Sequence, residues 1–225
     1  MLWQKRWIGL LQPSLLPPLS DAHIFLLLSL RPHGLAHLLL SPSQFHRLSY
    51  LAWKDFRFGS DSILVSFRYE KYREMIEKIE KAVPDYRAFV EDYIRKFYTI
   101  GGMIVFPKHA GSINQIKGTN PQIKDRWDLT LECIRRYYQG EESPLYRTLC
   151  RDKDFFNLFV DFRGYVDFFY LQDCVSEDYS TVKFWIGNGN FEEDPLPRSV
   201  DEYLRWIGAE MEFLNKRNVR IANAN

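Results

Sequence analysis

Residues 155–171, FFNLFVDFRGYVDFFYL, form an almost unbroken run of aromatic and aliphatic side chains. Three charged residues, Asp161, Arg163 and Asp167, interrupt this run, and Gly164 lies between them. Apolar segments of such density are buried in folded proteins, whereas buried charges are costly unless they are paired or hydrogen-bonded. The stretch therefore predicts a core helix whose polar residues have either a structural or a functional role.

A helical wheel divides this predicted helix, which we expect from Asp154 to about Cys174, into two faces. The apolar face carries Phe155, Leu158, Phe159, Phe162, Tyr165, Val166, Phe169 and Tyr170. The opposite face carries Asp154, Asn157, Asp161, Gly164 and Gln172, and Arg163 and Asp167 flank it. A glycine costs a helix about 1 kcal/mol relative to alanine, so Gly164 predicts that another helix or a ligand approaches closely.

Working outward, the remaining chain from residue 51 predicts mostly helix, with signals that mark several helix ends. Pro84 suits a first helical turn, Asn120-Pro121 is typical of a helix start, and Gly140 is typical of a helix end. The sequence Ser199-Val-Asp-Glu202 is a capping box. The expected helices cover residues 69–79, 84–97, 121–139, 144–149, 154–174 and 199–217.

Short strands are expected at residues 56–58, 103–106 and 181–186, and a polar loop at residues 109–120. The predicted fold class is α+β, mostly α: a helical domain with a small sheet of short strands. We expect residues 51–225 to form a single globular domain.

The composition indicates a globular protein in a reducing compartment. Hydrophobic residues make up 46% and charged residues 26% of the 225 residues, and the net charge is +1, which gives no general attraction to nucleic acid or membrane. Three widely spaced cysteines, Cys133, Cys150 and Cys174, support neither a disulfide framework nor a zinc site. We therefore expect a cytoplasmic location and no metal or cofactor.

Residues 1–50 differ from the rest of the chain. They hold one acidic residue, four lysines or arginines, four histidines, five prolines and 15 leucines. Prolines interrupt any continuous apolar core of a signal peptide, and the run 24–30 is too short to span a membrane. We expect an atypical arm, either mis-called or frameshifted sequence or a genuine and poorly ordered segment, with a membrane signal as the least favoured alternative.

Three motifs carry a resemblance to a known family. They are TIGGMIVFP at residues 99–107, DRWDLTLECIRRY at residues 125–137, and FFNLFVDFRGYVDF at residues 155–168 with Phe169 following. In these motifs the chain resembles a family of uncharacterised bacterial proteins, a domain of unknown function, over about residues 56–221. The resemblance implies no known activity and no catalytic residues.

The candidate site is built from charged residues in two of these motifs. An interior arginine needs a bidentate acid or a phosphate, so Arg126 is expected to pair with Asp161 or Asp167 or to bind a ligand. The alternative is purely structural: Arg163 and Asp167 would form an intrahelical pair, and Asp161 would accept hydrogen bonds from a neighbouring loop. The charged residues Asp125, Asp128, Glu132, Arg135 and Arg136 are expected on a solvated helix face.

The segment 112–120 supplies a second, weaker signal. It contains glycine, carries Lys117, and leads through Asn120 into the predicted helix start, an arrangement that can bind an anion through backbone N–H groups and the helix dipole. The ligand-binding candidates are therefore Arg126, Asp161, Arg163, Asp167, Lys117 and Asn120.

Three functions remain open from the sequence. The first is a protein that binds a small anionic ligand or a protein partner through a polar cleft. The second is an enzyme acting on a phosphate-containing or carbohydrate substrate, with Asp161 or Asp167 as base and the arginines as an electrostatic clamp. The third is a structural interaction module without a ligand site.

Overall fold

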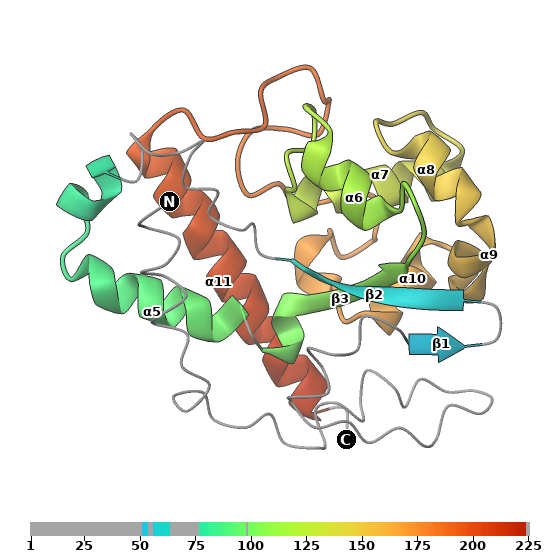
Figure 1. Cartoon of the computed structure of the whole chain (residues 1–225), viewed down its shortest axis with the longest axis horizontal. Helices are drawn as coiled ribbons and strands as arrows, with labels where there is room; N and C mark the ends of the chain where they lie inside the picture. Colours follow the sequence, from blue (N-terminus) through green and yellow to red (C-terminus); the bar gives the residue numbers. More distant parts are fainter. Residues whose placement is uncertain (1–50, 54–55, 64–76, 98, 224–225) are drawn as a thin grey trace.

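The computed structural model describes residues 51–53, 56–63, 77–97 and 99–223, which form a mostly helical protein with one small sheet (Figure 1). This agrees with the predicted fold class. The arm at residues 1–50 lies outside the described residues, as does most of the helix expected at residues 69–79. Of the latter, the described part is helical over residues 77–82.

The sheet has three antiparallel strands in the order β1 (Leu51–Trp53), β2 (Phe56–Ser62) and β3 (Met103–Pro107). Phe58 pairs with Pro107 and Ser62 with Met103. The expected strands at residues 56–58 and 103–106 are thereby confirmed, whereas β1 was not predicted.

Besides the helical residues 77–82, seven helices lie in the described part of the chain. They are α5 (Tyr86–Phe97), α6 (Ile113–Thr119), α7 (Trp127–Gln139), α8 (Tyr146–Arg151), α9 (Lys153–Phe156), α10 (Phe162–Phe168) and α11 (Val200–Asn223). Single 3₁₀ turns are η2 (Ile100–Gly102), η3 (Asn157–Phe159) and η4 (Gln172–Cys174). The long helix α11 runs diagonally through the molecule and packs against α5, η2 and η4 (Figure 1).

Two helix ends follow their predicted signals. Helix α7 ends at Gly140, whose φ of 73° is the left-handed conformation that glycine adopts without strain. Helix α11 begins with a variant of the predicted capping box: the Glu202 N–H donates to Ser199 Oγ at 3.1 Å, and Glu202 Oε2 accepts from the N–H of Arg198, the residue before the cap, at 2.7 Å. The helix continues to Asn223, beyond the expected end near residue 217.

The expected helix start at Asn120-Pro121 is wrong. Lys124 and Asp125 have φ values of 50° and 70°, which breaks the helical path, so α7 begins only at Trp127. Asn120 instead closes a turn, because its Oδ1 accepts from the Gln122 N–H at 2.8 Å. The segment expected as a polar loop at residues 109–120 contains α6.

The single helix expected from Asp154 to Cys174 is also wrong. The segment is α9, then η3, then a sharp turn, then α10. Val160, at φ 71° and ψ −55°, is the central residue of this turn, and the Asp161 N–H donates to the Phe159 carbonyl at 2.9 Å. These are the features of a classic γ-turn, which is rare and strained. We call residues 159–161 the Val160 turn.

Two residues of the segment 155–171 stabilise this turn. Asp161 is the N-cap of α10 and accepts from the Gly164 N–H at 2.7 Å. A Cβ on Gly164 would lie 2.0 Å from the Phe159 carbonyl oxygen, so only glycine fits there. The close approach predicted for Gly164 exists, but it is made by the chain's own backbone rather than by another helix or a ligand.

The strand expected at residues 181–186 is wrong as well. Val182 forms an isolated antiparallel bridge with Val175, and the rest of that stretch is irregular. Lys183 donates its N–H to the Cys174 carbonyl at 2.8 Å, so the segment 174–183 folds back as a small loop beside α10.

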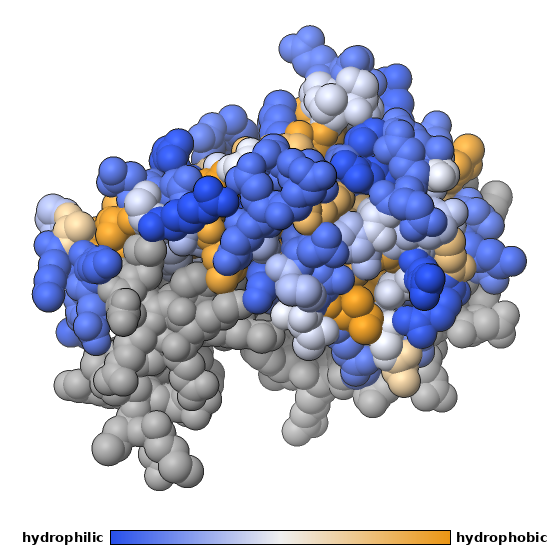
Figure 2. Space-filling view, turned by 90° about the horizontal axis from the view of Figure 1, so that it is seen from above, coloured by the Kyte–Doolittle hydropathy of each residue, from blue (hydrophilic) through white to orange (hydrophobic). Residues whose placement is uncertain are grey.

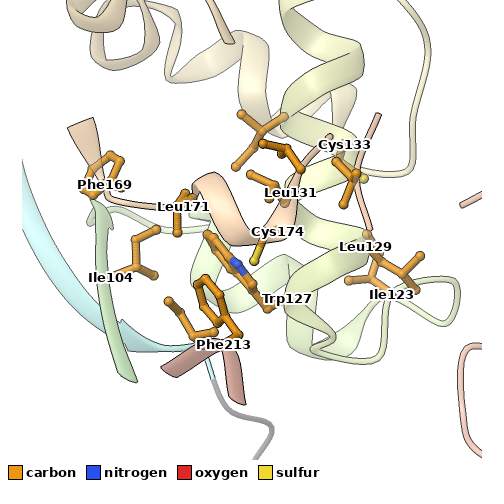
Figure 3. Packing of buried hydrophobic residues seen from close by; sticks show 14 of the residues in the cluster. Ile104, Ile123, Trp127, Leu129, Leu131, Cys133, Phe169, Leu171, Cys174 and Phe213 are labelled. Carbon is orange, nitrogen blue, oxygen red and sulfur yellow. The ribbon is translucent and has the colours of Figure 1, made fainter. Parts of the chain in front are cut away.

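The core lies where α7, α10, β3 and α11 meet, around the fully buried Trp127 (Figure 3). Leu131, Leu171, Cys174 and Phe213 surround it in the same view. The segment 155–171 adds a cluster of aromatic rings to this core. Between ring centroids, Phe159 lies 5.2 Å from Tyr165, 4.7 Å from Phe168 and 5.3 Å from Phe169.

Thiol reactivity tests this core. Cys133 and Cys174 are buried, and burial raises the pKa of Cys133 to about 12 and also raises that of Cys174. Because the thiolate is the reactive form, iodoacetamide should modify Cys150 alone in the native chain and all three thiols in denaturant. Intact-mass spectrometry reads both states, and equal native labelling of Cys133 or Cys174 would contradict this packing.

Candidate functional site

The six predicted site residues lie in three separate environments. Arg126 is in the core at the start of α7, Lys117 and Asn120 are in and after α6, and Asp161, Arg163 and Asp167 are on the exposed side of α10. The sequence placed them in one cleft. The structure brings together only the three on α10.

Arg126 pairs with Asp128, not with Asp161 or Asp167, so the expected pairing is wrong. Its Nε donates to Asp128 Oδ1 at 3.0 Å, and one Nη2 hydrogen donates to Asp128 Oδ2. The carbonyls of Pro195 and Ile186 accept two further hydrogen bonds at 2.8 and 2.7 Å. Four of the five guanidinium N–H donors are therefore used inside the protein.

Asp128 is fully buried, contrary to the solvated face predicted for this side of the helix. Besides Arg126 it accepts from the Leu129 N–H and the Trp185 N–H, each at 3.0 Å. A buried ion pair whose remaining hydrogen-bonding capacity is satisfied in this way is a structural element, and it ties α7 to the segment 185–195.

Glu132 is also nearly buried, and it joins two arginines of the same helix. Arg135 donates from Nε and Nη2 to its two oxygens at 2.8 Å, and Arg136 Nε donates to Oε1 at 2.8 Å. Glu132 and Arg136 thus form an i, i+4 ion pair on α7. Arg136 also reaches the Gly189 carbonyl at 2.9 Å, so it holds the loop after the segment 174–183 against α7.

Lys117 is buried and lies between two carboxylates. Its Nζ is 2.9 Å from Asp61 Oδ2 on β2, and it also contacts Asp125 Oδ1. Burial acts to lower the pKa of Lys117, but the charges of Asp61 and Asp125 outweigh it, and the pKa is raised. The lysine therefore stays cationic and connects α6 to the sheet and to the turn at Asp125.

The exposed side of α10 carries the remaining three residues and Tyr179. Arg163 Nε lies 3.7 Å from Asp167 Oδ2, and the predicted intrahelical pair is confirmed as an exposed contact. Asp167 Oδ1 accepts from Tyr179 Oη at 2.7 Å and from Gln172 Nε2 at 3.0 Å. The Arg163 guanidinium lies 4.8 Å from the centroid of the Tyr179 ring.

Asp161 has a different partner from the one expected. Its carboxylate caps α10 rather than receiving a hydrogen bond from a neighbouring loop. The three charged residues of the segment 155–171, Asp161, Arg163 and Asp167, are not buried, because the break in the helix places all of them on the surface.

Sequence reasoning missed a second buried arginine, Arg217 on α11. It donates from Nε to the Phe169 carbonyl at 2.9 Å and from Nη1 to the carbonyls of Gly101 and Met103 at 2.7 and 2.8 Å. Burial lowers the pKa of Arg217 to about 10, which leaves it cationic at neutral pH. Its apolar neighbours on α11, Phe213, Leu214 and Ile221, were the available signal that this face is buried.

Asn218, the residue after Arg217, explains the first glycine, Gly101, of the motif at 99–107. Asn218 Oδ1 accepts from the Gly101 N–H at 2.8 Å, and a Cβ on Gly101 would lie 2.6 Å from this oxygen. Asn218 Nδ2 also donates to Thr99 Oγ1 at 3.0 Å. The motif is therefore the surface on which α11 is fixed.

The surface of the described residues is mostly hydrophilic in the view from above, with small hydrophobic areas between (Figure 2). Over the whole described surface, the exposed large hydrophobic residues are Leu158 (44%), Val160 (86%) and Val219 (58%). Val160 is the centre of the Val160 turn and Leu158 directly precedes this turn, and both are near Asp161 and Arg163 in the sequence. We call residues 157–161 with Arg163, Asp167 and Tyr179 the α10 surface.

The architecture defines a mostly helical domain with a small antiparallel sheet, a buried arginine at the start of one helix and a second arginine on the last. Within the described residues, none of the helices is long and apolar enough to cross a membrane. The chain belongs to a family of unknown function, DUF6994, which matches residues 17–221 and so includes part of the atypical arm. No curated protein and no solved structure matches the chain.

Proposed function

We propose that this protein binds a protein partner through the α10 surface and that its buried charges serve the fold. The observation that carries the proposal is Val160, a β-branched residue that is 86% exposed at the centre of a strained turn. Strained backbone of this kind costs about 1–3 kcal/mol and is concentrated at functional sites. Valine at such a position gains nothing from burial in the isolated chain.

The composition of the α10 surface supports a protein partner. Leu158 and Val160 supply exposed apolar area, and Arg163 and Tyr179 are residue types enriched at the energetic centres of interfaces. The Tyr179 hydroxyl donates to Asp167, and the Tyr179 ring lies against the Arg163 guanidinium. These contacts order the side chains before binding, so they lose less conformational entropy when a partner docks.

The anionic-ligand and enzyme hypotheses have less support. Arg126 and Lys117, the two cations expected to bind an anion, are buried and engaged by protein carboxylates. Asp161 and Asp167, the two expected bases, accept hydrogen bonds from Gly164, Tyr179 and Gln172 on the surface. Arg163 is the predicted cation that is exposed, and in our proposal it forms part of the partner interface.

Cross-linking tests the proposal directly. A photo-reactive amino acid at position 158, introduced in the cells that make this protein, should form a cross-link to a defined partner. The matched control is the same amino acid at position 219, where it replaces an exposed valine on α11. The same products from both positions, or none from position 158, would contradict the proposal.

Affinity measurements then separate binding from folding. Leu158→Ser should weaken binding of the purified partner by about tenfold or more, because burying a leucine side chain is worth about 1.5–3 kcal/mol. Val219→Ser should leave the dissociation constant unchanged. Calorimetric titration measures both, and equal affinities for the two variants would count against the α10 surface.

Val160→Gly provides a variant whose stability and binding should change in opposite directions. Glycine relieves the strain of the positive φ, and after its own entropy cost the free energy of unfolding should rise by about 0.5–1 kcal/mol. Partner binding should nevertheless weaken, because the exposed side chain is lost. Urea unfolding and the same titration test the two effects, and a drop in stability would show that Val160 is not strained.

A further inference from the structure

His109 lies between two hydrogen-bond acceptors. Its Nε2 is 2.7 Å from Asp152 Oδ1, and its Nδ1 is 3.1 Å from the Ala110 carbonyl oxygen. A neutral imidazole has one N–H donor and one acceptor nitrogen, whereas the imidazolium form has two donors. With Asp152 ionised, only the protonated ring can make both hydrogen bonds.

The side chain of Arg151 also connects the segment around His109 to the end of α8. Arg151, which precedes Asp152 at the end of α8, donates to the Gly111 carbonyl. A Cβ on Gly111 would lie 3.1 Å from an Arg151 nitrogen, and its φ is 71°, so glycine suits both the turn and the contact. The Ser112 N–H donates to the His109 carbonyl at 3.1 Å and closes the turn.

We propose that His109 is a proton-controlled latch that fastens the segment 108–112 to the junction of α8 and α9. Protonated His109 closes the latch through both ring nitrogens. Deprotonation leaves a lone pair facing either the Asp152 carboxylate or the Ala110 carbonyl, one hydrogen bond is lost, and the segment opens more often. This proposal is independent of the α10 surface.

The charged groups that act on the ring are Asp152, which favours the imidazolium, and Arg151, which opposes it. The hydrogen bond to the Ala110 carbonyl raises the pKa of His109 most, burial opposes this, and Asp152 adds to the rise. A raised folded-state pKa contributes stability that is fully present below the ordinary value of 6.5 and is lost as the pH rises through the folded value. The latch therefore weakens as the pH rises through the folded-state pKa of His109, which lies above 6.5.

The carboxylate partner is suited to this role because it is nearly buried. Burial raises the pKa of Asp152, and the His109 contact lowers it in part. Asp152 Oδ2 is buried without a hydrogen-bond partner, so its charge is compensated mainly by His109 and to a smaller extent by Arg151. The Asp152 carbonyl also accepts from the Phe155 N–H at 2.9 Å, so the latch joins the segment 108–112 to the first turn of α9.

Amide hydrogen exchange tests the latch on the whole chain. Between pH 6 and pH 8.5, protection of the Gly111 and Ser112 amides, corrected for the intrinsic exchange rate, should fall several-fold in the native protein. His109→Gln keeps one donor toward Asp152 and cannot titrate, so its protection should be independent of pH. Arg151→Met is the matched control: protection should be lower at every pH, with the same pH dependence as the unaltered chain.

A nuclear magnetic resonance titration gives a second measurement that does not depend on the variant's stability. The ring C–H signal of His109 should titrate above pH 6.5 in the unaltered chain and at a lower pH in Asp152→Asn. A midpoint at or below 6.5, or protection that does not change with pH in the unaltered chain, would overturn the proposal.

Discussion

Replacing Arg217 by methionine should lower the free energy of unfolding by about 4 kcal/mol, because two buried and one part-buried hydrogen bonds to carbonyl oxygens are lost, at about 1–3 kcal/mol for each oxygen before relaxation. Those carbonyls belong to Phe169, Gly101 and Met103, so the loss affects the end of α10, η2 and β3 together. Methionine keeps much of the length and apolar contact of the side chain. Urea unfolding followed by circular dichroism measures the effect.

Arg220→Met is the matched control for this prediction. Arg220 lies one turn further along α11 and pairs with Asp173 at 2.7 and 3.0 Å on the surface. Its replacement should cost less than about 1 kcal/mol, since exposed ion pairs contribute little. Equal losses for the two variants would show that Arg217 does not connect these elements.

Replacing Gly164 by alanine should destabilise the fold by about 3 kcal/mol or more, because the added methyl group overlaps backbone rather than a movable side chain. The new Cβ would lie 2.0 Å from the Phe159 carbonyl oxygen, which accepts the hydrogen bond of the Val160 turn. Relief requires α10 to shift away from the turn. Thermal and urea unfolding of the purified variant measure the loss.

Gly208→Ala supplies the control, because Gly208 is also helical and has nothing within 4 Å of an added Cβ. The substitution on α11 should stabilise the protein by about 0.5–1 kcal/mol, the ordinary gain of alanine over glycine in a helix. Opposite signs for the two glycines are expected. A stabilising Gly164→Ala substitution would contradict the close contact at the turn.

Local signals in the sequence predicted those parts of the fold that depend on a few neighbouring residues. Gly140 ends α7 through its own backbone conformation, and Ser199 with Glu202 begins α11 through side-chain hydrogen bonds. The apolar run at residues 103–106 predicted β3, in which Ile104 and Phe106 are fully buried. None of these features requires knowledge of distant parts of the chain.

Predictions failed where backbone conformation is set by contacts that the sequence does not display. A helical wheel assumes a continuous helix, and valine is not a residue expected at a positive φ, so the break at Val160 could not be predicted. The same applies to Lys124 and Asp125, which delay the start of α7. Asn120-Pro121 has the chemistry of a helix start, but it begins a turn.

The candidate site failed for a related reason. Arg126 was recognised as an interior arginine, but its carboxylate partner Asp128 is only two residues away, and the wheel had assigned Asp128 to solvent. The distant partners, the carbonyls of Pro195 and Ile186, come from an irregular segment that carries no periodic signal. The Arg163–Asp167 pair was predictable because it depends on helical spacing alone.

The Val160 turn also bears on the order in which the chain folds. In a straight helix, residues 159 and 169 would lie about 15 Å apart along the axis, whereas the rings of Phe159 and Phe169 are 5.3 Å apart. The turn doubles the segment back on itself, so a dense group of aromatic contacts closes loops of about ten residues. Such short loops cost little entropy to close. This stretch can therefore assemble early as a local nucleus, before α11 and the sheet, which lie far away in the sequence, pack against it.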